Sequence, residues 1–305
     1  MKKALCILGP TAVGKTALSL FLAPHFQGVI FSADSIQVYN GLDIISGKDK
    51  DSYGDSPVEM LDLVSPKYSF NVSDYVRTFR TKLKNIKPDQ MPIIVGGTGF
   101  YISALINGVE TSEIKPDKKL RKFLEGKNVK ELQEILSQKN PEKFLKMNSS
   151  DRDNPRRLVR AIEIASINQN SKSKTPNVKK PLENFDIKII GLILPKNELD
   201  KRIDERVEKR MEDGALGEAQ SLFKGYKSLS TQIKRANGYK QLFAYLENET
   251  TLEKAIELWK IAEHQNAKKQ MTFFKKIKNI AWFNFSEKSQ KEILAYVQEW
   301  YNKNK

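Results

Sequence analysis

Short apolar runs alternate along the chain with longer stretches in which apolar residues recur every three or four positions. The apolar runs occupy residues 4–8, 29–33, 92–95, 186–194 and 280–285. Runs of this length, bounded by polar or turn-forming residues, are typical of strands that are buried on both faces. The periodic stretches predict helices over residues 15–25, 73–86, 99–106, 197–213, 251–276 and 288–302. Together the two patterns predict an α/β protein whose parallel sheet is covered by helices.

The segment 114–184 departs from this alternation. It has no run that predicts a strand, whereas DKKLRKFLE and VKELQEILSQ predict short helices and its polar end, 168–181, predicts an exposed loop. The segment has 18 Lys/Arg against 9 Asp/Glu, so it carries +9 of the net charge of +15. We therefore predict a core from residues 1–113 and 185–305, with a helical C-terminal part, and a basic helical insertion over 114–184. Such an insertion is typical of a nucleic-acid-binding arm, and a solvated lysine-rich lid is the alternative.

Composition excludes several classes of protein. No stretch approaches the roughly 18 consecutive apolar residues of a membrane span, and the apolar run after MKK is too short for a signal peptide. Cys6 is the single cysteine, so an internal disulfide is impossible, and His25 and His264 form no cluster with zinc-ligand spacing. We expect a cytoplasmic monomer with no membrane partner. The net charge of +15 favours an anionic macromolecule as the partner, unless lysine is simply abundant throughout the proteome.

A phosphate-binding pattern follows the first predicted strand. In GPTAVGKT, Gly9 stands four residues before Gly14-Lys15-Thr16, and an apolar-periodic helix follows. The glycines let backbone N–H groups point at an anion, the helix adds its positive end, and Lys15 adds a full charge. Thr16 can offer its hydroxyl to Mg²⁺, which makes it the candidate metal ligand. We predict that this P-loop binds a phosphate chain through Gly9, Pro10, Thr11, Ala12, Val13, Gly14, Lys15 and Thr16.

Two further strand ends carry candidate chemistry. In SADSIQVYNGLDI, Asp34 follows a predicted strand, and in IIVGGTGFYI, Thr98 lies within a glycine-rich turn. The carboxyl ends of strands face the ligand crevice in an open α/β sheet. A carboxylate beside a phosphate loop either binds a metal or takes a proton from a substrate. The alternative for Asp34 is a structural role as the cap of a turn or helix.

The order of six motifs points to a family. GPTAVGKT, SADSIQVYNGLDI, IIVGGTGFYI, DNPRRLVRAIEI, ANGYKQL and AKKQMTFF occur in the order found in tRNA dimethylallyltransferases (tRNA isopentenyltransferases, the IPP transferase family). The chain resembles this family over about residues 1–285. The resemblance implies a P-loop NTPase-like core and transfer of the dimethylallyl group from dimethylallyl diphosphate to N6 of the adenosine immediately 3′ of the anticodon in tRNA. It also implies Mg²⁺ as cofactor and diphosphate as the leaving group.

The resemblance assigns roles to individual residues. Asp34 matches the catalytic aspartate, which would act as the base, and Thr98 and Arg206 would stabilise the departing diphosphate. From the residues alone, Arg206 in LDKRIDERVEKRM is one charge among many on a helix. The positions that match tRNA-binding residues of the family are Asp34, Ser35, Ile36, Gln37, Thr98, Arg121, Arg156, Arg157, Leu158, Val159 and Arg160.

For some of these positions, the residue types themselves indicate a role. The amide of Gln37 can make paired hydrogen bonds to an adenine edge. In DNPRRLVRA, Asn154 is the predicted helix cap with Pro155 at the first position, and Arg156 and Arg160 share a face that can follow phosphates or simply face solvent.

Three departures from the family stand out. Ile36 replaces the usual arginine, Val58 and Glu59 replace a common histidine pair, and ISGKDK at 45–50 replaces Gly-Thr-Ala-Lys-Pro. The contact made by the family's arginine is therefore not carried over to Ile36, and substrate contacts in the region 45–60 are expected to differ from those of the family.

Three other functions fit parts of the pattern. A P-loop nucleoside or nucleotide kinase would use the same loop for ATP, but it needs no basic arm, and no clear strand ends in a second metal-binding carboxylate. A catalytically silent RNA-binding protein is less consistent with Lys15, Asp34 and Thr98 all being present. An enzyme that prenylates free adenine nucleotides is disfavoured, because a mononucleotide substrate needs no long positive surface. The sequence favours the tRNA prenyltransferase, with the kinase as the alternative.

Overall fold

The computed structural model describes residues 1–108, 117–170 and 180–303, without the side chains of residues 167–170. The chain forms two compact units, one from residues 1–108 with 180–305 and one from residues 109–179. The sequence pattern placed the second junction after residue 184, but Leu182 already belongs to the first unit. Leu182 is 1% exposed, and its N–H donates to the carbonyl of Leu105 at 3.3 Å.

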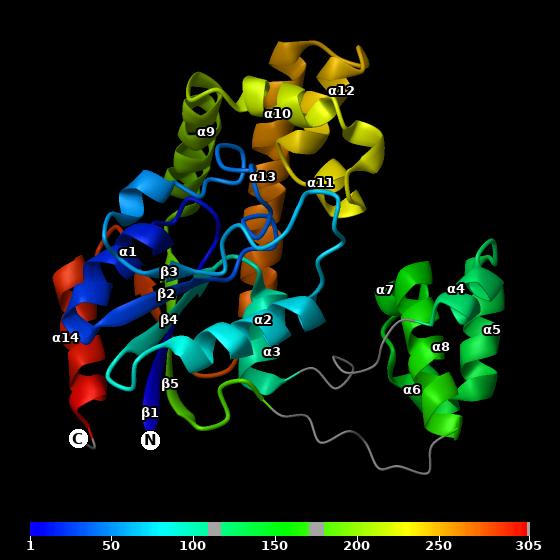
Figure 1. The fold of residues 1–305 in the computed structure, drawn as a ribbon, viewed down its shortest axis with the longest axis horizontal. Coiled ribbons are helices and arrows are strands. Elements are labelled where there is room, and N and C mark those ends of the chain that lie inside the picture. The colour runs from blue at the N-terminus through cyan, green and yellow to red at the C-terminus, as the bar shows by residue number, and fades with distance from the viewer. Residues whose placement is uncertain (109–116, 171–179, 304–305) are drawn as a thin grey trace. The chain divides into compact units, whose positions relative to one another are not determined.

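A parallel sheet forms the centre of the first unit and confirms the predicted fold class. Within the described residues it has six strands in the order β3-β2-β4-β1-β5-β6 (Figure 1). The strands are β1 (Lys2–Leu8), β2 (Gly28–Ser32), β3 (Val58–Glu59), β4 (Met91–Gly96), β5 (Phe185–Ile193) and β6 (Ile280–Asn284). The sequence pattern missed β3, because two residues are too few to form an apolar run. Val58 and Glu59, which replace the family's histidine pair, thus form the edge strand beside β2.

Helices cover both faces of the sheet because successive strand residues point to opposite faces and both sets are apolar. On one face pack α1 (Lys15–Leu22) and α14 (Gln290–Asn302), and on the other α2 (Val72–Asn85) and α3 (Gly99–Asn107) (Figure 1). The cluster under α1 and α14 includes Leu5, Ile7, Leu18, Leu22, Ile293 and Val297. On the opposite face, the ring centroids of Phe31 and Phe79 lie 4.9 Å apart, and those of Tyr75 and Tyr101 lie 4.0 Å apart. The predicted helix 15–25 is shorter in the structure, since Pro24 has no N–H to continue it and a 3-10 turn follows.

The strand register brings three loops to one edge of the sheet. Leu8 of β1 pairs with Gly96 of β4, and Ser32 of β2 pairs with Val95. The turns that follow β1, β2 and β4 therefore begin at the same level. This is the edge at which parallel α/β sheets bind their ligands.

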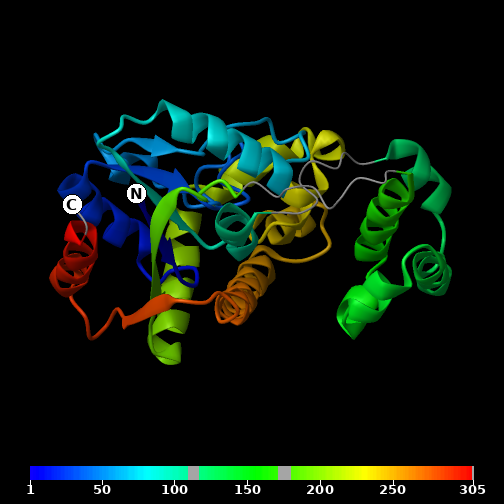
Figure 2. The same cartoon turned by 90° about the horizontal axis from the view of Figure 1, so that it is seen from below.

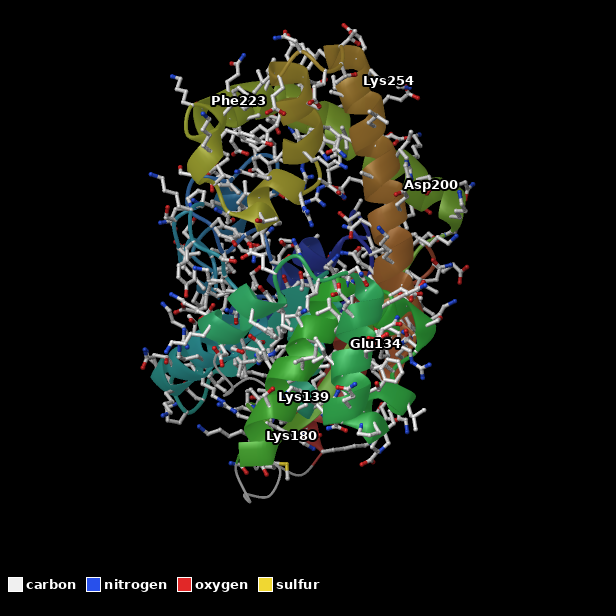
Figure 3. All side chains as sticks on the ribbon, turned by 90° about the vertical axis from the view of Figure 1, so that its right-hand side faces the viewer. Glu134, Lys139, Lys180, Asp200, Phe223 and Lys254 are labelled. Atoms are coloured by element: carbon white, nitrogen blue, oxygen red, sulfur yellow. The ribbon has the colours of Figure 1, made fainter. Side chains whose placement is uncertain are left out.

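The C-terminal half adds helices beside that edge. They are α9 (Lys196–Glu212), α10 (Ala215–Phe223), α11 (Thr231–Arg235), α12 (Tyr239–Leu246) and α13 (Leu252–Phe274), after which the chain adds β6 and α14 (Figure 2). The sequence pattern predicted α9 and α13 but not the three short helices between them. Figure 3 shows Asp200 of α9 beside α13, where its carboxylate lies 2.9 Å from Nδ1 of His264. Among the described residues, no helix is long and apolar enough to cross a membrane.

The second unit is helical where the structure describes it. Its helices are α4 (Lys118–Leu124), α5 (Val129–Lys139), α6 (Pro141–Lys146), α7 (Ser149–Arg152) and α8 (Pro155–Asn170). The start of α8 is as predicted, with Oδ1 of Asn154 accepting from the N–H groups of Arg156 and Arg157 at 3.1 and 3.3 Å. The predicted loop 168–181 is helical up to residue 170, and residues 171–179 lie outside the described part.

Candidate active site

A cavity of about 860 Å³ opens at the carboxyl edge of the sheet. Its walls come from the P-loop, the turns after β2 and β4, the loop 45–53, and one face each of α9 and α13. The cavity brings together the three predicted catalytic residues, Asp34, Thr98 and Arg206. The predicted P-loop residues that line it are Thr11, Ala12, Gly14, Lys15 and Thr16.

The P-loop has the curled backbone that its glycines predict. Gly14 has a φ of 102° and α1 starts directly after it, so the first amides of the helix face the loop. The ammonium of Lys15 donates to the carbonyl of Pro10 at 2.7 Å. The side chain of Val13 is fully buried in the core, so a ligand contact of Val13 would be made by its backbone alone. The loop thus presents backbone amides and a lysine to the cavity.

The charge of Lys15 depends on what occupies the cavity. Burial, together with the positive charge of Arg206, lowers the pKa of Lys15 to about 7, although the carboxylate of Asp34 acts in the opposite direction. An anion bound in the loop would favour the charged lysine. The electrostatics therefore suit a ligand with several negative charges.

Asp34 has one oxygen in a structural role and one available for chemistry. Its Oδ1 accepts from the N–H groups of Ile36 and Gln37 at 2.8 and 3.4 Å, which caps the turn. Its Oδ2 makes no hydrogen bond to any residue that the structure describes, and the side chain lines the cavity. The capping role that the sequence offered as the alternative is therefore correct for Oδ1. Because these hydrogen bonds fix the carboxylate, they also set the direction of Oδ2.

Thr98, in the turn after β4, is hydrogen-bonded to the turn after β2 that contains Asp34. Its Oγ1 accepts from the N–H of Ser35 at 3.0 Å, and its own N–H donates to the carbonyl of Ala33 at 3.0 Å. The backbones approach so closely that a Cβ on Gly96 would lie 2.2 Å from the carbonyl oxygen of Ala33. Glycine is therefore required at position 96 for the turns after β2 and β4 to meet.

Arg206 reaches the P-loop from α9. Its Nη1 donates to Oγ1 of Thr11 at 3.0 Å, across 195 positions of sequence. The residues alone favoured one more charge on a helix, but in the structure Arg206 lies beside the phosphate loop. The arrangement puts a guanidinium opposite the amides of the loop.

Gln270 is a residue that the sequence analysis missed. From α13, its Oε1 accepts from the N–H of Thr11 at 2.8 Å and its Nε2 donates to the carbonyl of Gly97 at 3.1 Å. One side chain thus connects the P-loop to the turn that contains Thr98. The available signal was a neutral amide within the basic and aromatic motif AKKQMTFF.

Gln37 lines the cavity and is hydrogen-bonded within the protein, while its pairing with adenine stays a prediction. Its Oε1 accepts from the hydroxyl of Ser32 at 2.7 Å, and its Nε2 donates to the carbonyl of Gly47 at 2.9 Å. Both ends of the amide therefore have protein partners. Gln37 thus holds the loop 45–53 against β2, and it lines the cavity together with Ser35 and Ile36.

The altered segment ISGKDK is held by an extensive set of polar contacts. Lys48 has no exposed surface, and its ammonium lies 2.8 Å from the carboxylate of Asp43 and 2.5 Å from that of Asp62. The carboxylate of Glu218 accepts from the N–H groups of residues 43, 44 and 45 at 2.7, 2.7 and 3.1 Å. The wall of the cavity that departs from the family motif is therefore a firmly held loop.

In the helical unit, two of the predicted RNA-binding arginines are bound by one carboxylate. Glu163 is 1% exposed and accepts from Nε of Arg121 at 2.6 Å and from Nη1 of Arg160 at 2.9 Å. Burial opposes ionisation of Glu163, but these hydrogen bonds outweigh it, and its pKa is lowered. Leu158 is fully buried in the core of the unit, so its side chain packs there and has no surface exposed to a partner. Arg156 is exposed at the start of α8.

The remaining two predicted positions also have partners in this unit. The guanidinium of Arg157 forms an ion pair with Asp151. Val159 is partly buried against the core of the unit.

Replacing Glu163 by glutamine is expected to destabilise the helical unit. Only the carboxylate of this network is buried, since the side chains of Arg121 and Arg160 are 47% and 27% exposed, so the expected cost is that of hydrogen bonds to a charged group, about 1.5–3 kcal/mol. Folding lowers the pKa of Glu163 from its ordinary value of 4.5. The ionised carboxylate therefore stabilises the folded unit above pH 4.5, and this contribution is lost as the pH falls through the lower pKa of the folded state. Thermal unfolding followed by circular dichroism between about pH 7 and pH 3 measures this effect.

The exposed Glu134 on α5 provides the matched control for that measurement (Figure 3). Glu134→Gln should unfold like the wild type at each pH. Equal midpoints for Glu163→Gln and the wild type at neutral pH would contradict the assigned role of Glu163.

The donor set at the P-loop fits Mg²⁺ better than a metal held by protein ligands alone. Within the described residues, no three His, Cys, Asp or Glu side chains are grouped as a metal site. Thr16 lines the cavity and lies in hydrogen-bonding reach of Tyr53, whose pKa is raised to about 12, chiefly by burial. Mg²⁺ commonly takes one or two protein oxygens and completes its shell with water and phosphate oxygens. Thr16 can supply such an oxygen.

Comparison with known proteins agrees with this architecture. The family model described as IPP transferase matches residues 37–277. A tRNA dimethylallyltransferase of Anoxybacillus flavithermus is 34% identical over 97% of this chain and 96% of the relative, and one of Enterococcus faecalis is 34% identical over 98% and 99%. The crystal structure of a tRNA isopentenylpyrophosphate transferase from Bacillus halodurans is 31% identical, covers 98% of this chain and 96% of its own, and has a TM-score of 0.71. The chain therefore belongs to the IPP transferase family.

Proposed function

We propose that the protein transfers the dimethylallyl group of dimethylallyl diphosphate to N6 of the adenosine immediately 3′ of the anticodon in tRNA. The observation that carries this proposal is the placement of Asp34 in the same cavity as the P-loop and Arg206. The diphosphate of the donor requires a cationic phosphate site. The adenosine requires a carboxylate oxygen that is free to take its proton. Membership of the IPP transferase family supports the same reaction.

The P-loop would hold the diphosphate of the donor. Ala12, Gly14, Lys15 and Thr16 of the P-loop line that part of the cavity together with Arg206. Their backbone amides, the ammonium of Lys15 and the guanidinium of Arg206 would contact the diphosphate. As the C1–O bond breaks, its electron pair leaves with the diphosphate, whose charge these groups stabilise. Mg²⁺ would supply further stabilisation of the phosphate oxygens, with Thr16 as its protein ligand.

Asp34 would act on the acceptor. The lone pair of N6 is delocalised into the adenine ring, so attack on C1 is assisted when a base takes the N6 proton. The new bond joins N6 to C1, and the proton moves to Oδ2 of Asp34. The adenosine must first be extruded from the stacked anticodon loop, which costs roughly a few kcal/mol. Ser35 and Ile36 line the cavity next to Asp34 and would contact the extruded base.

The alternative reaction class from the sequence, a P-loop kinase, is not favoured. It would bind ATP in the same loop and transfer a phosphoryl group to a small acceptor. The family match favours prenyl transfer. A kinase that acts on a small acceptor would also need no helical unit with excess positive charge.

The helical unit would bind the RNA. We expect Arg156→Ala to weaken binding of an anticodon stem-loop and to lower the slope of log K against log salt by about one, as for one lost phosphate contact. Arg160→Ala is the informative comparison, because the ion pair of Arg160 with Glu163 gives it a structural role. Fluorescence anisotropy over a salt series measures both slopes. An unchanged slope for Arg156→Ala would exclude its phosphate contact.

One incubation tests the proposed function. The protein is mixed with dimethylallyl diphosphate, Mg²⁺ and an anticodon stem-loop RNA, and the digested nucleosides are analysed by mass spectrometry. We expect adenosine to gain one dimethylallyl group. If the protein instead phosphorylates small acceptors with ATP and leaves the RNA unmodified, the kinase is the correct reading.

A further inference from the structure

Arg210 is a buried cation whose hydrogen-bonding groups are not used by any residue that the structure describes. It lies one helical turn after Arg206 on α9, is 8% exposed and lines the cavity. Within the part of the chain that the structure describes, its guanidinium makes no hydrogen bond or ion pair. A buried charge without such partners is costly unless a ligand supplies them.

The neighbour of Arg210 has the same charge. Nη2 of Arg210 and Nη2 of Arg206 lie 2.2 and 2.3 Å from the position that a Cβ on Gly47 would occupy. Both guanidiniums therefore reach the same point of the cavity wall, and only a residue without a side chain leaves room for them there. Two like charges this close repel each other unless an anion lies against both.

The arginine pair faces the phosphate loop. Arg206, Arg210, Thr11 and Ala12 line the same cavity, and Glu263 of α13 lines it beside them. Burial and the charge of Arg206 lower the pKa of Arg210 to about 9, while Glu263 acts in the opposite direction. An anion bound between the loop and α9 would meet donors from both sides.

We propose that Arg210 binds the distal phosphate of an organic diphosphate and forms, with Arg206, a two-arginine clamp opposite the P-loop. This inference rests on the proposed function, because it takes the donor to be a diphosphate. The P-loop surrounds one end of the phosphate chain, and guanidinium groups match phosphate oxygens with paired N–H donors. Arg210 thereby gives the site its preference for a diphosphate over a single phosphate.

The competing explanation is that Arg210 only neutralises Glu263. Glu263 lies on α13 and is also 8% exposed. If neutralisation were the whole role of Arg210, removing both charges together would leave anion binding unchanged. If Arg210 binds phosphate, the double variant must bind diphosphate as weakly as the single one.

Calorimetric titration with inorganic diphosphate and with inorganic phosphate, both with Mg²⁺, tests the inference. We expect Arg210→Met to weaken diphosphate binding by about tenfold to a hundredfold, as for one lost hydrogen-bonded charge contact, and to change phosphate binding far less. Arg210→Met/Glu263→Gln should show the same loss. Lys209→Met is the control, because it removes the same charge one residue away, where the side chain is 71% exposed and paired with Asp213.

The possible results separate the two proposals. Wild-type affinity for diphosphate in Arg210→Met, or recovery of that affinity in the double variant, would overturn the role of Arg210. Loss in both variants with an unchanged control supports it. That support holds even if the wild type transfers no prenyl group to RNA, a result that would refute the proposed function alone.

Discussion

Replacing Asp34 by asparagine is expected to lower kcat for prenyl transfer by about 10²- to 10⁴-fold, the usual contribution of a positioned general base. Asparagine keeps the oxygen that accepts from the N–H groups of Ile36 and Gln37, so the turn stays capped. It cannot take the N6 proton, because its amide group is not basic. RNA affinity should stay close to that of the wild type. Single-turnover kinetics with anticodon stem-loop RNA, and anisotropy for binding, measure the two effects.

Asp51 supplies a control for the loss of charge. It is an exposed carboxylate in the 3-10 turn Lys50–Tyr53, so Asp51→Asn should leave kcat unchanged. Full turnover by Asp34→Asn would show that Asp34 is not the base. Weakened RNA binding with unchanged kcat would assign it to recognition instead.

Replacing Arg206 by glutamine is expected to lower kcat by about 10²- to 10³-fold, as does the loss of one preorganised group that stabilises charge in the transition state. The guanidinium lies beside the P-loop, with Nη1 3.0 Å from Oγ1 of Thr11, where the charge of the leaving diphosphate develops. Glutamine retains a donor for Thr11 but has no positive charge. Single-turnover rates at saturating donor measure the chemical step.

The control for Arg206 is Lys201, on the same helix. Its side chain is 77% exposed and its ammonium lies 3.7 Å from Glu205, so Lys201→Gln should react at the wild-type rate. If Arg206→Gln raises KM for the donor and leaves kcat unchanged, Arg206 contributes to ground-state binding rather than to the departure of diphosphate.

Local sequence patterns were sufficient for most of the sheet and for three loops of the site. An apolar run followed by GPTAVGKT specifies a strand, a phosphate loop and a helix, because each feature depends on neighbouring residues. Lys15, Asp34 and Thr98 could be predicted to meet, since the carboxyl ends of parallel strands share one edge. The edge strand β3 and the helices α10, α11 and α12 have only 2, 9, 5 and 8 residues, which is too short for a periodic pattern to be read, so packing decided them.

What only the tertiary structure decided is which polar side chain meets which. Arg206 and Gln270 reach Thr11 across 195 and 259 positions of sequence, and no local pattern encodes such a contact. Gln37 and Arg160 had the residue types for binding RNA, but the fold supplies protein partners for both. The sequence thus determined where strands end and which chemical groups stand there. The packing of distant helices decided which of those groups stay free to act, because hydrogen bonds and ion pairs depend on distance in space and not on spacing along the chain.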